Sequence, residues 1–330
     1  MNGILVILKP PGMTSHDVVA LVRRNLGQRR VGHTGTLDPG AAGVLVLCLG
    51  SATRLVPYME DHVKGYRGEL CLGRSTDTQD ASGEVLQEDR TFFITDKEIR
   101  LAFAAFRGEI EQIPPMVSAL RHQGKRLYEL ARQGKVVERN PRPVRIYELS
   151  PVGNWQKGQW MFCDVVRFDV VCSKGTYVRT LCQDIGSYLG VPAHMSFLLR
   201  TQVGPWSLED ALTLEEFKQI ARNSAKGEVL GTEVFKSRGF FSMDHGIKHL
   251  PGVVITLEAG RLLRHGRRVK VSQVAHLLDA EDTAVETTHK SQGILRIYND
   301  HGRFLGLGCF EETEGERELQ PVRVLPLESD

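Results

Sequence analysis

The sequence lacks several features that would assign a class at once. No stretch of its 330 residues is apolar over enough length to cross a bilayer, and no basic segment precedes an apolar one at the start, so we expect a cytoplasmic protein. The six cysteines form no Cys-x-x-Cys pair, so neither a disulfide framework nor a structural zinc site is supported. Phosphate-binding loops, metal-ligand clusters and dinucleotide motifs are also missing, and we expect no cofactor and no metal.

Charge of one sign is not in excess either, because the net charge is only +2. Its distribution is uneven, however. The segment from Arg107 to Arg145 holds nine lysines and arginines against four glutamates, and residues 261–270 hold five basic residues and no acidic one. Two basic patches on a nearly neutral chain indicate a polyanion bound at defined places. For one patch alone, a solvated helix face is an equally good interpretation.

The composition is otherwise that of a globular protein, 41% hydrophobic and 25% charged, and the length suffices for two domains. Apolar or alternating runs predict strands at 4–8, 43–49, 66–72, 144–149 and 160–171. Capping residues and helical spacing predict helices at 15–26, 95–106 and 127–133, and after Thr176 and Thr213. Glycine and charged residues at 224–239 indicate a boundary. Short strands follow at 253–256, 269–271, 294–298, 304–309 and 322–325.

One loop, residues 30–40, lies between a predicted helix and a buried strand. It surrounds Asp38 with glycines and a proline, and places His33 and two threonines close by. Glycine permits a tight backbone and proline restricts it, so the carboxylate is expected at a fixed place on a loop rim. Loops on rigid scaffolds often carry catalytic groups. For Asp38 alone, a capped turn in which the side chain bonds its own backbone is the simpler interpretation.

Three further polar features need an explanation together with Asp38. They are Tyr66 in a strand, the loop 76–80, and Arg179 in the first turn of a helix. A carboxylate nucleophile must stay ionised, and an arginine at contact distance favours that state and orients the group. An aromatic ring offers a face on which a flipped base can stack. Each residue taken singly is better interpreted as a structural one.

Taken together, these features resemble the TruB-type tRNA pseudouridine synthases. The resemblance covers residues 3 to about 210, and the motifs occur in the family's order and spacing. The matching segments are Gly32–Pro39, Lys64 with Tyr66, Leu72–Asp80, Ile113–Leu120, Ser173–Thr180 and Leu198–Thr201. The part beyond residue 250 is similar to the PUA RNA-binding module that follows in this family.

The resemblance implies an isomerase that converts one uridine of the tRNA T loop, position 55, to pseudouridine on a flipped-out base. Asp38 matches the family's nucleophile, and Arg179 matches the arginine paired with it. Tyr66 matches the tyrosine that stacks on the base and serves in proton removal from C5. The substrate-binding residues implied by the motifs are His33, Lys64, Tyr177, Leu198, and, in the basic segment, Lys125 and Arg126.

The same resemblance implies an α+β fold with a mixed, largely antiparallel central sheet flanked by helices. We expect a catalytic domain at 1–240, with an RNA-gripping insertion at about 113–145, and a small β-rich PUA-like domain at 250–330. The expected partner is the T-arm stem-loop of tRNA, bound by a monomer without an obligate protein partner. Val117 stands where many relatives carry a tyrosine, and Gly40 and Ala42 also depart from the usual residues.

Two other functions remain open from the sequence. In the first, the chain is a non-catalytic RNA binder or tRNA-folding chaperone, which the intact set of Asp38, Tyr66 and Arg179 argues against. In the second, it is the subunit of a guide-RNA-dependent synthase. Such members usually carry extra basic sequence at the N-terminus, whereas here the first strand follows three residues after the start. We therefore favour the stand-alone enzyme.

Overall fold

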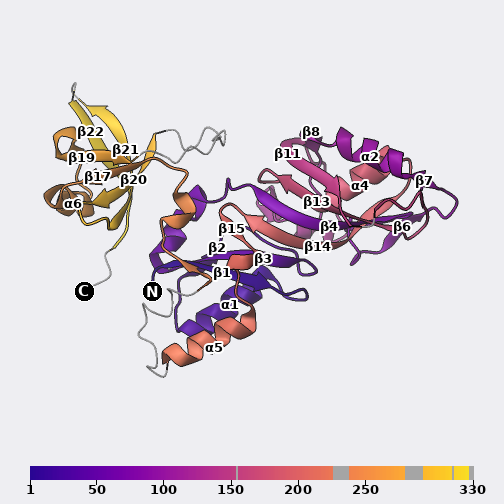
Figure 1. The fold of residues 1–330 in the computed structure, drawn as a ribbon, viewed down its shortest axis with the longest axis horizontal. Helices are drawn as coiled ribbons and strands as arrows, with labels where there is room; N and C mark the ends of the chain where they lie inside the picture. The colour runs from indigo at the N-terminus through magenta and orange to yellow at the C-terminus, as the bar shows by residue number, and fades with distance from the viewer. Residues whose placement is uncertain (154, 226–237, 279–292, 314–315, 327–330) are drawn as a thin grey trace.

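The computed structural model describes residues 1–153, 155–225, 238–278, 293–313 and 316–326 (Figure 1). Its largest feature is a mixed sheet in the order β16-β1-β3-β14-β4-β13-β11-β8, in which only β3 and β14 run parallel as neighbours. This confirms the predicted α+β fold. The strands are β1 Gly3–Lys9, β3 Ala42–Leu49, β4 Lys64–Leu72, β8 Gly108–Gln112, β11 Arg142–Pro151, β13 Val165–Cys172, β14 Ala193–Val203 and β16 Phe240–Phe241.

Helices cover the two ends of this sheet (Figure 1). α1 (Ser15–Leu26) and α5 (Leu214–Ala225) pack on the apolar side chains of β1 and β3, while α2 (Asp96–Ala105) and α4 (Val178–Tyr188) pack on β4, β11, β13 and β14. Their ends follow the predicted caps. Thr14 and Thr95 each close a capping box, and Gly27 ends α1 at a φ of 60°. Within the described ranges, no helix has the length and apolarity needed to span a membrane.

The strand predicted at 160–171 is wrong as one element. β12 (Gln159–Trp160) pairs with β7 (Ile94–Thr95), and β13 begins only at Val165. Between them the chain turns, because the Asp164 carboxylate accepts a hydrogen bond from the Met161 amide at 2.7 Å and Cys163 adopts a φ of 63°. A short strand, β5 (Arg74–Thr76), leads into the loop 76–80 and pairs with β6 (Val85–Glu88).

The basic segment forms a small hairpin and a single helical turn. β9 (Arg121–His122) pairs with β10 (Lys125–Arg126), and α3 (Leu127–Ala131) follows directly. Leu127 and Leu130 are buried, and this fixes the helix on its apolar side. Lys125, at the start of β10, is exposed.

The described residues of the C-terminal part form a six-stranded sheet with one α-helix, which confirms the predicted small β-rich domain. α6 (Leu257–Arg264) was not predicted from the sequence, and part of this stretch was interpreted only as a basic patch. Thr256 nevertheless caps the helix. The sheet has its own core. Its strands are β17 Gly252–Ile255, β18 Val269–Lys270, β19 Val274–Leu278, β20 Ile294–Asn299, β21 Phe304–Thr313 and β22 Glu316–Val324.

The C-terminal domain is joined to the rest of the fold by polar and apolar contacts. The Tyr298 hydroxyl donates to the Asp244 carboxylate at 2.8 Å, and Arg54 donates to the Val324 carbonyl at 3.1 Å. Leu307 and Leu325 join a core cluster made mainly by the large sheet. The expected domain limits, 1–240 and 250–330, stay a prediction, and most of the expected boundary segment lies outside the described residues at 226–237.

Candidate active site

The Asp38 loop is held in place by its neighbours in the N-terminal fold. The Ser15 hydroxyl accepts a hydrogen bond from the Leu37 amide at 2.9 Å and donates to the Leu37 carbonyl at 3.2 Å. The Gly12 amide donates to the Pro39 carbonyl at 2.8 Å, and the Ala41 amide to the Asp38 carbonyl at 3.1 Å. With its backbone tied on both sides, the loop presents an Asp38 side chain that is 40% exposed.

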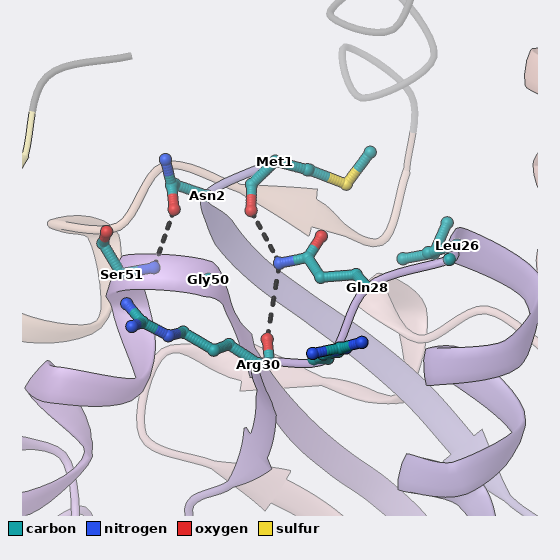
Figure 2. Close-up of a pocket in the computed structure, with 9 residues that line it drawn as sticks. Met1, Asn2, Leu26, Gln28, Arg30, Gly50 and Ser51 are labelled. Atoms are coloured by element: carbon teal, nitrogen blue, oxygen red, sulfur yellow. Dashed lines mark hydrogen bonds between the residues drawn. The ribbon is translucent and has the colours of Figure 1, made fainter.

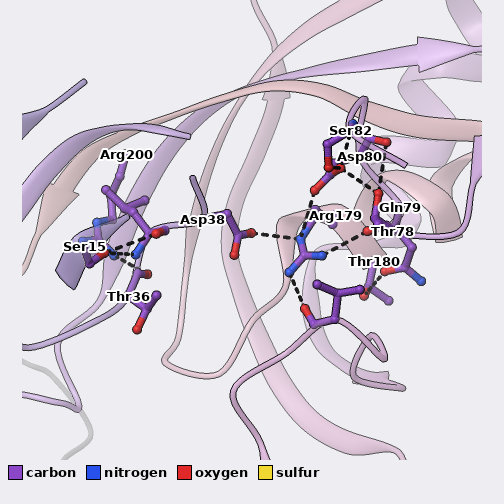
Figure 3. A network of polar contacts seen from close by, with 12 residues as sticks. Ser15, Thr36, Asp38, Thr78, Gln79, Asp80, Ser82, Arg179, Thr180 and Arg200 are labelled. Atoms are coloured by element: carbon purple, nitrogen blue, oxygen red, sulfur yellow. Dashed lines mark hydrogen bonds and ion pairs between the residues drawn. The ribbon is translucent and has the colours of Figure 1, made fainter. Parts of the chain in front are cut away.

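A buried arginine faces this carboxylate. Arg179, in the first turn of α4, has a side chain only 5% exposed, and its Nε lies 3.0 Å from the Asp38 Oδ2 (Figure 3). The other guanidinium nitrogens donate to the Thr78 carbonyl at 3.0 Å and the Val117 carbonyl at 2.8 Å. Three contacts in different directions leave the guanidinium one orientation, so it fixes the Asp38 carboxylate as well.

A second carboxylate, Asp80, lies 3.9 Å from the same Arg179 nitrogen. It is itself fixed, since its Oδ1 accepts hydrogen bonds from the hydroxyls of Thr78 and Ser82 at 2.7 and 2.6 Å. The sequence indicates the loop 76–80 as a polar feature, but it does not by itself identify Asp80 as a site residue. The missing information was spatial, because only the folded chain brings residue 80 to residue 179.

Tyr66 lies beside this group, on the sheet. It belongs to one apolar cluster with Leu37 and Leu198, and only 9% of its surface is exposed. Burial raises the pKa of the Tyr66 hydroxyl to about 12, against the nearby positive charge of Arg200, which lowers it. Arg200 is a second buried arginine that the sequence did not select, and in Figure 3 Asp38 lies between Arg200 and Arg179.

The remaining predicted substrate-binding residues differ in their surroundings. Burial lowers the pKa of His33, and its ring meets the His16 ring edge-on, with the ring centroids 5.7 Å apart. Burial also lowers the pKa of Lys64 to about 8, and its Nζ donates to the His62 carbonyl at 2.9 Å. The Tyr177 amide donates to the Gln112 side chain at 3.0 Å, just before α4.

Lys125 and Arg126 lie apart from these groups, on the β9–β10 hairpin. The Arg126 guanidinium donates to the Tyr128 hydroxyl at 3.2 Å and lies 5.8 Å from the centre of that ring. Arg132 lies over the same ring at 5.6 Å. The hairpin and α3 therefore present an aromatic ring beside two cations, a suitable surface for an RNA backbone and its bases.

A cavity of about 460 Å³ lies elsewhere, between the first residues and the end of α1 (Figure 2). The Gln28 side chain bridges the carbonyls of Met1 and Arg30 at 2.8 and 3.3 Å, and the Ser51 amide donates to the Asn2 side chain. None of the predicted site residues lines this cavity. Its contacts tie the N-terminus to the start of the Asp38 loop.

The sequence and the fold are similar to those of known proteins. Family models match residues 23–178 (TruB family pseudouridylate synthase, N terminal domain), 179–234 (tRNA pseudouridylate synthase B C-terminal domain) and 251–325 (Pseudouridine synthase II TruB, C-terminal). A protein of Alkaliphilus oremlandii named tRNA pseudouridine synthase B is 46% identical over 326 residues, 98% of this chain and 99% of that protein. The chain belongs to the TruB pseudouridylate synthase family.

Two further comparisons agree with membership of the TruB family. A protein of the same name from Symbiobacterium thermophilum is 55% identical over 216 residues, 66% of this chain and 71% of that protein. Among solved structures, the crystal structure of a Cbf5-Nop10-Gar1 complex contains a chain that is 27% identical, with a TM-score of 0.71 over 98% of this chain and 84% of that one. Asp38 and Tyr66 lie in the first matched TruB region and Arg179 begins the second, so the ion pair joins the two.

Proposed function

We propose that this protein isomerises uridine to pseudouridine in tRNA, at position 55 of the T loop. The observation that carries the proposal is the Asp38–Arg179 ion pair at the rim of the site, in a chain 46% identical to a protein named tRNA pseudouridine synthase B. The reaction is an internal rearrangement. The bond from C1′ to N1 breaks, the base rotates, a bond from C1′ to C5 forms, C5 loses a proton and N1 gains one.

In this proposal, Asp38 is the nucleophile that bonds to the uridine nucleotide, and Arg179 keeps its carboxylate aimed at the substrate. Tyr66 stacks on the base and serves in the removal of the C5 proton. Leu198, buried in the same apolar cluster, lines the base pocket. Because the target atoms are inaccessible in a stacked base, the uridine must first be flipped out, and His33 fills the space against the loop.

The basic hairpin supports the RNA side of the proposal. Lys125 and Arg126 contact phosphates of the T arm and position it, whereas the shape of the loop supplies the selectivity. Lys64 and Tyr177 contact the nucleotides near the target. We place the enzyme in the cytoplasm, as a monomer that needs neither metal nor cofactor.

The guide-RNA-dependent alternative is separated from this proposal by one experiment. A T-arm stem-loop carrying tritium at C5 of its uridines releases the label when a C1′–C5 bond forms. We expect release by the purified protein alone, at an unchanged rate when guide RNA is added. Release that required a guide RNA or a protein partner would contradict the proposal, and binding without release would favour the chaperone function.

A further inference from the structure

Arg200 occupies a special position in the central sheet. It pairs with Tyr66 of β4 on one side and with Gly43 of β3 on the other, at the parallel junction of the sheet. Only 2% of its surface is exposed. Burying an arginine destabilises the fold unless its donors have hydrogen-bond partners. The contacts of Arg200 therefore indicate which groups it positions.

Those contacts go to both halves of the site. The Arg200 Nε donates to the Val44 carbonyl at 2.8 Å, and the two terminal nitrogens donate to the carbonyls of Gly35 and Thr36 at 3.1 and 3.3 Å. Arg200 also stands opposite Tyr66 in the register of the two strands, and its positive charge acts to lower the pKa of the Tyr66 hydroxyl. One residue thus holds the backbone just ahead of Asp38 and lies beside the stacking tyrosine.

The backbone around Arg200 is built to bring it this close. Gly43 has a φ of 121°, and a Cβ placed there would lie 2.2 Å from the Arg200 carbonyl oxygen. Glycine is therefore required at position 43 by close approach as well as by conformation. Lys9 completes the frame from the other side, with its Nζ donating to the carbonyls of Met13 and Pro39 at 2.6 and 3.4 Å.

We propose that Arg200 is a positioning residue, which holds Tyr66 and the Gly35–Thr36 end of the Asp38 loop in a fixed relation to each other. It does not touch the substrate. It fixes the place of Tyr66 beside the site, and it prevents the loop from shifting the carboxylate of Asp38. This role in the reaction rests on the proposed function, whereas the contact with Tyr66 does not.

The kinetic test uses Arg200→Met, Arg200→Lys and a matched control. Arg296 of the C-terminal domain is likewise buried, and it donates to a tyrosine hydroxyl, that of Tyr298, at 3.1 Å. We expect Arg200→Met to lower the single-turnover rate constant at saturating RNA by about 100-fold, because a shift of about 1 Å in a catalytic group has an effect of this size. RNA affinity should stay unchanged. Arg200→Lys should regain part of this rate because it keeps the charge, and Arg296→Met should lose stability only.

A second measurement does not depend on activity. A fluorinated tyrosine placed at position 66 titrates in an accessible range of pH and is followed by absorbance. We expect Arg200→Met to raise its pKa, because a positive charge beside the phenolate is lost, and Arg296→Met to leave it unchanged. If wild type forms no pseudouridine but this shift is seen, the proposed function fails and the contact stands. An unmoved titration in Arg200→Met and Arg200→Lys, or rates equal to wild type, would overturn the inference.

Discussion

The Nε of Arg179 lies 3.0 Å from the Oδ2 of Asp38, and the two side chains differ sharply in exposure, 5% against 40%. The arginine is part of the protein interior, and the aspartate is the end of that network that a substrate can reach. This asymmetry distinguishes the pair from an ordinary surface salt bridge. It also argues against the capped-turn interpretation of Asp38, because the carboxylate pairs across the fold with a group 141 positions later in the numbering.

Arg179→Met should separate the catalytic use of this pair from its structural one. The carbonyls of Thr78 and Val117 lose their donor, so we expect a loss of about 1–3 kcal/mol in the free energy of unfolding. The single-turnover rate should fall by roughly 100-fold as Asp38 loses its fixed orientation. Urea unfolding and tritium release measure the two effects. As control, Arg67→Met removes an exposed ion pair with Asp169 and should change neither quantity by much.

Tyr66→Phe keeps the ring and removes the hydroxyl. We expect the affinity for the T-arm stem-loop to stay within a few-fold of wild type, because stacking is retained. The rate constant for pseudouridine formation should fall by about 10²–10⁴-fold, the usual contribution of a proton-transfer group. Filter binding and tritium release on one preparation check both statements. A variant that binds poorly but reacts at the wild-type rate once saturated would assign Tyr66 to recognition alone.

The basic hairpin is tested by charge reversal. Lys125→Glu with Arg126→Glu should weaken tRNA binding and make its dependence on salt shallower, by about one unit of slope or more. Lys97→Glu with Arg100→Glu, on α2, makes the same change of charge away from the hairpin and should have little effect. Binding isotherms at several salt concentrations give the slopes. Equal slopes for both variants would mean that the hairpin is only a solvated surface.

Protonation of His62 makes the stability of the fold depend on pH. Its ring lies edge-on to Trp206 and His249, with centroids at 5.8 and 5.5 Å, and burial lowers its pKa to about 4. Between its unfolded value near 6.5 and about 4, only the unfolded chain binds this proton, so stability falls as pH falls through that window. Lowering the pH from 7 to 4.5 therefore reduces the free energy of unfolding by about 2 kcal/mol through this group.

Urea unfolding at the two pH values measures this loss. His62→Gln should reduce the difference between them, and replacement of the exposed His276 should leave it as in wild type. An equal pH dependence in His62→Gln and wild type would show that other groups cause the acid sensitivity.

Local patterns in the sequence predicted the helices that cover the large sheet and the strands β1, β3, β4 and β11, but not β8 or the long strand β14. Thr14 and Gly27 mark the ends of α1 because capping depends on residues a few positions apart. The prediction of one strand at 160–171 was wrong because the Asp164 side chain closes a turn inside this apolar run. The stretch around Arg261 counted only as charge, although Thr256 caps a helix there.

The site could be predicted only where a motif carried it. Asp38, Tyr66 and Arg179 stand in recognisable motifs. In the fold, Arg179 pairs with Asp38, and Tyr66 lies on β4. Asp80 and Arg200 also lie in matching segments, but they were not selected as site residues, since a charged residue in a loop or a strand is usually exposed. Their roles come from long-range packing. Arg200 reaches the Gly35 carbonyl across 165 positions of sequence, a relation that no local pattern contains.

The most direct test of the account is the Asp38→Asn variant. We predict that it binds the T-arm stem-loop as wild type does and releases no tritium from its C5-labelled uridines, because an amide cannot replace the nucleophilic carboxylate. Asp89→Asn is the matched control, since the Asp89 carboxylate caps its own turn by accepting hydrogen bonds from the Thr91 amide and hydroxyl, both at 2.8 Å, and this variant should react at the wild-type rate. Tritium release by Asp38→Asn at a rate near that of wild type would contradict the account.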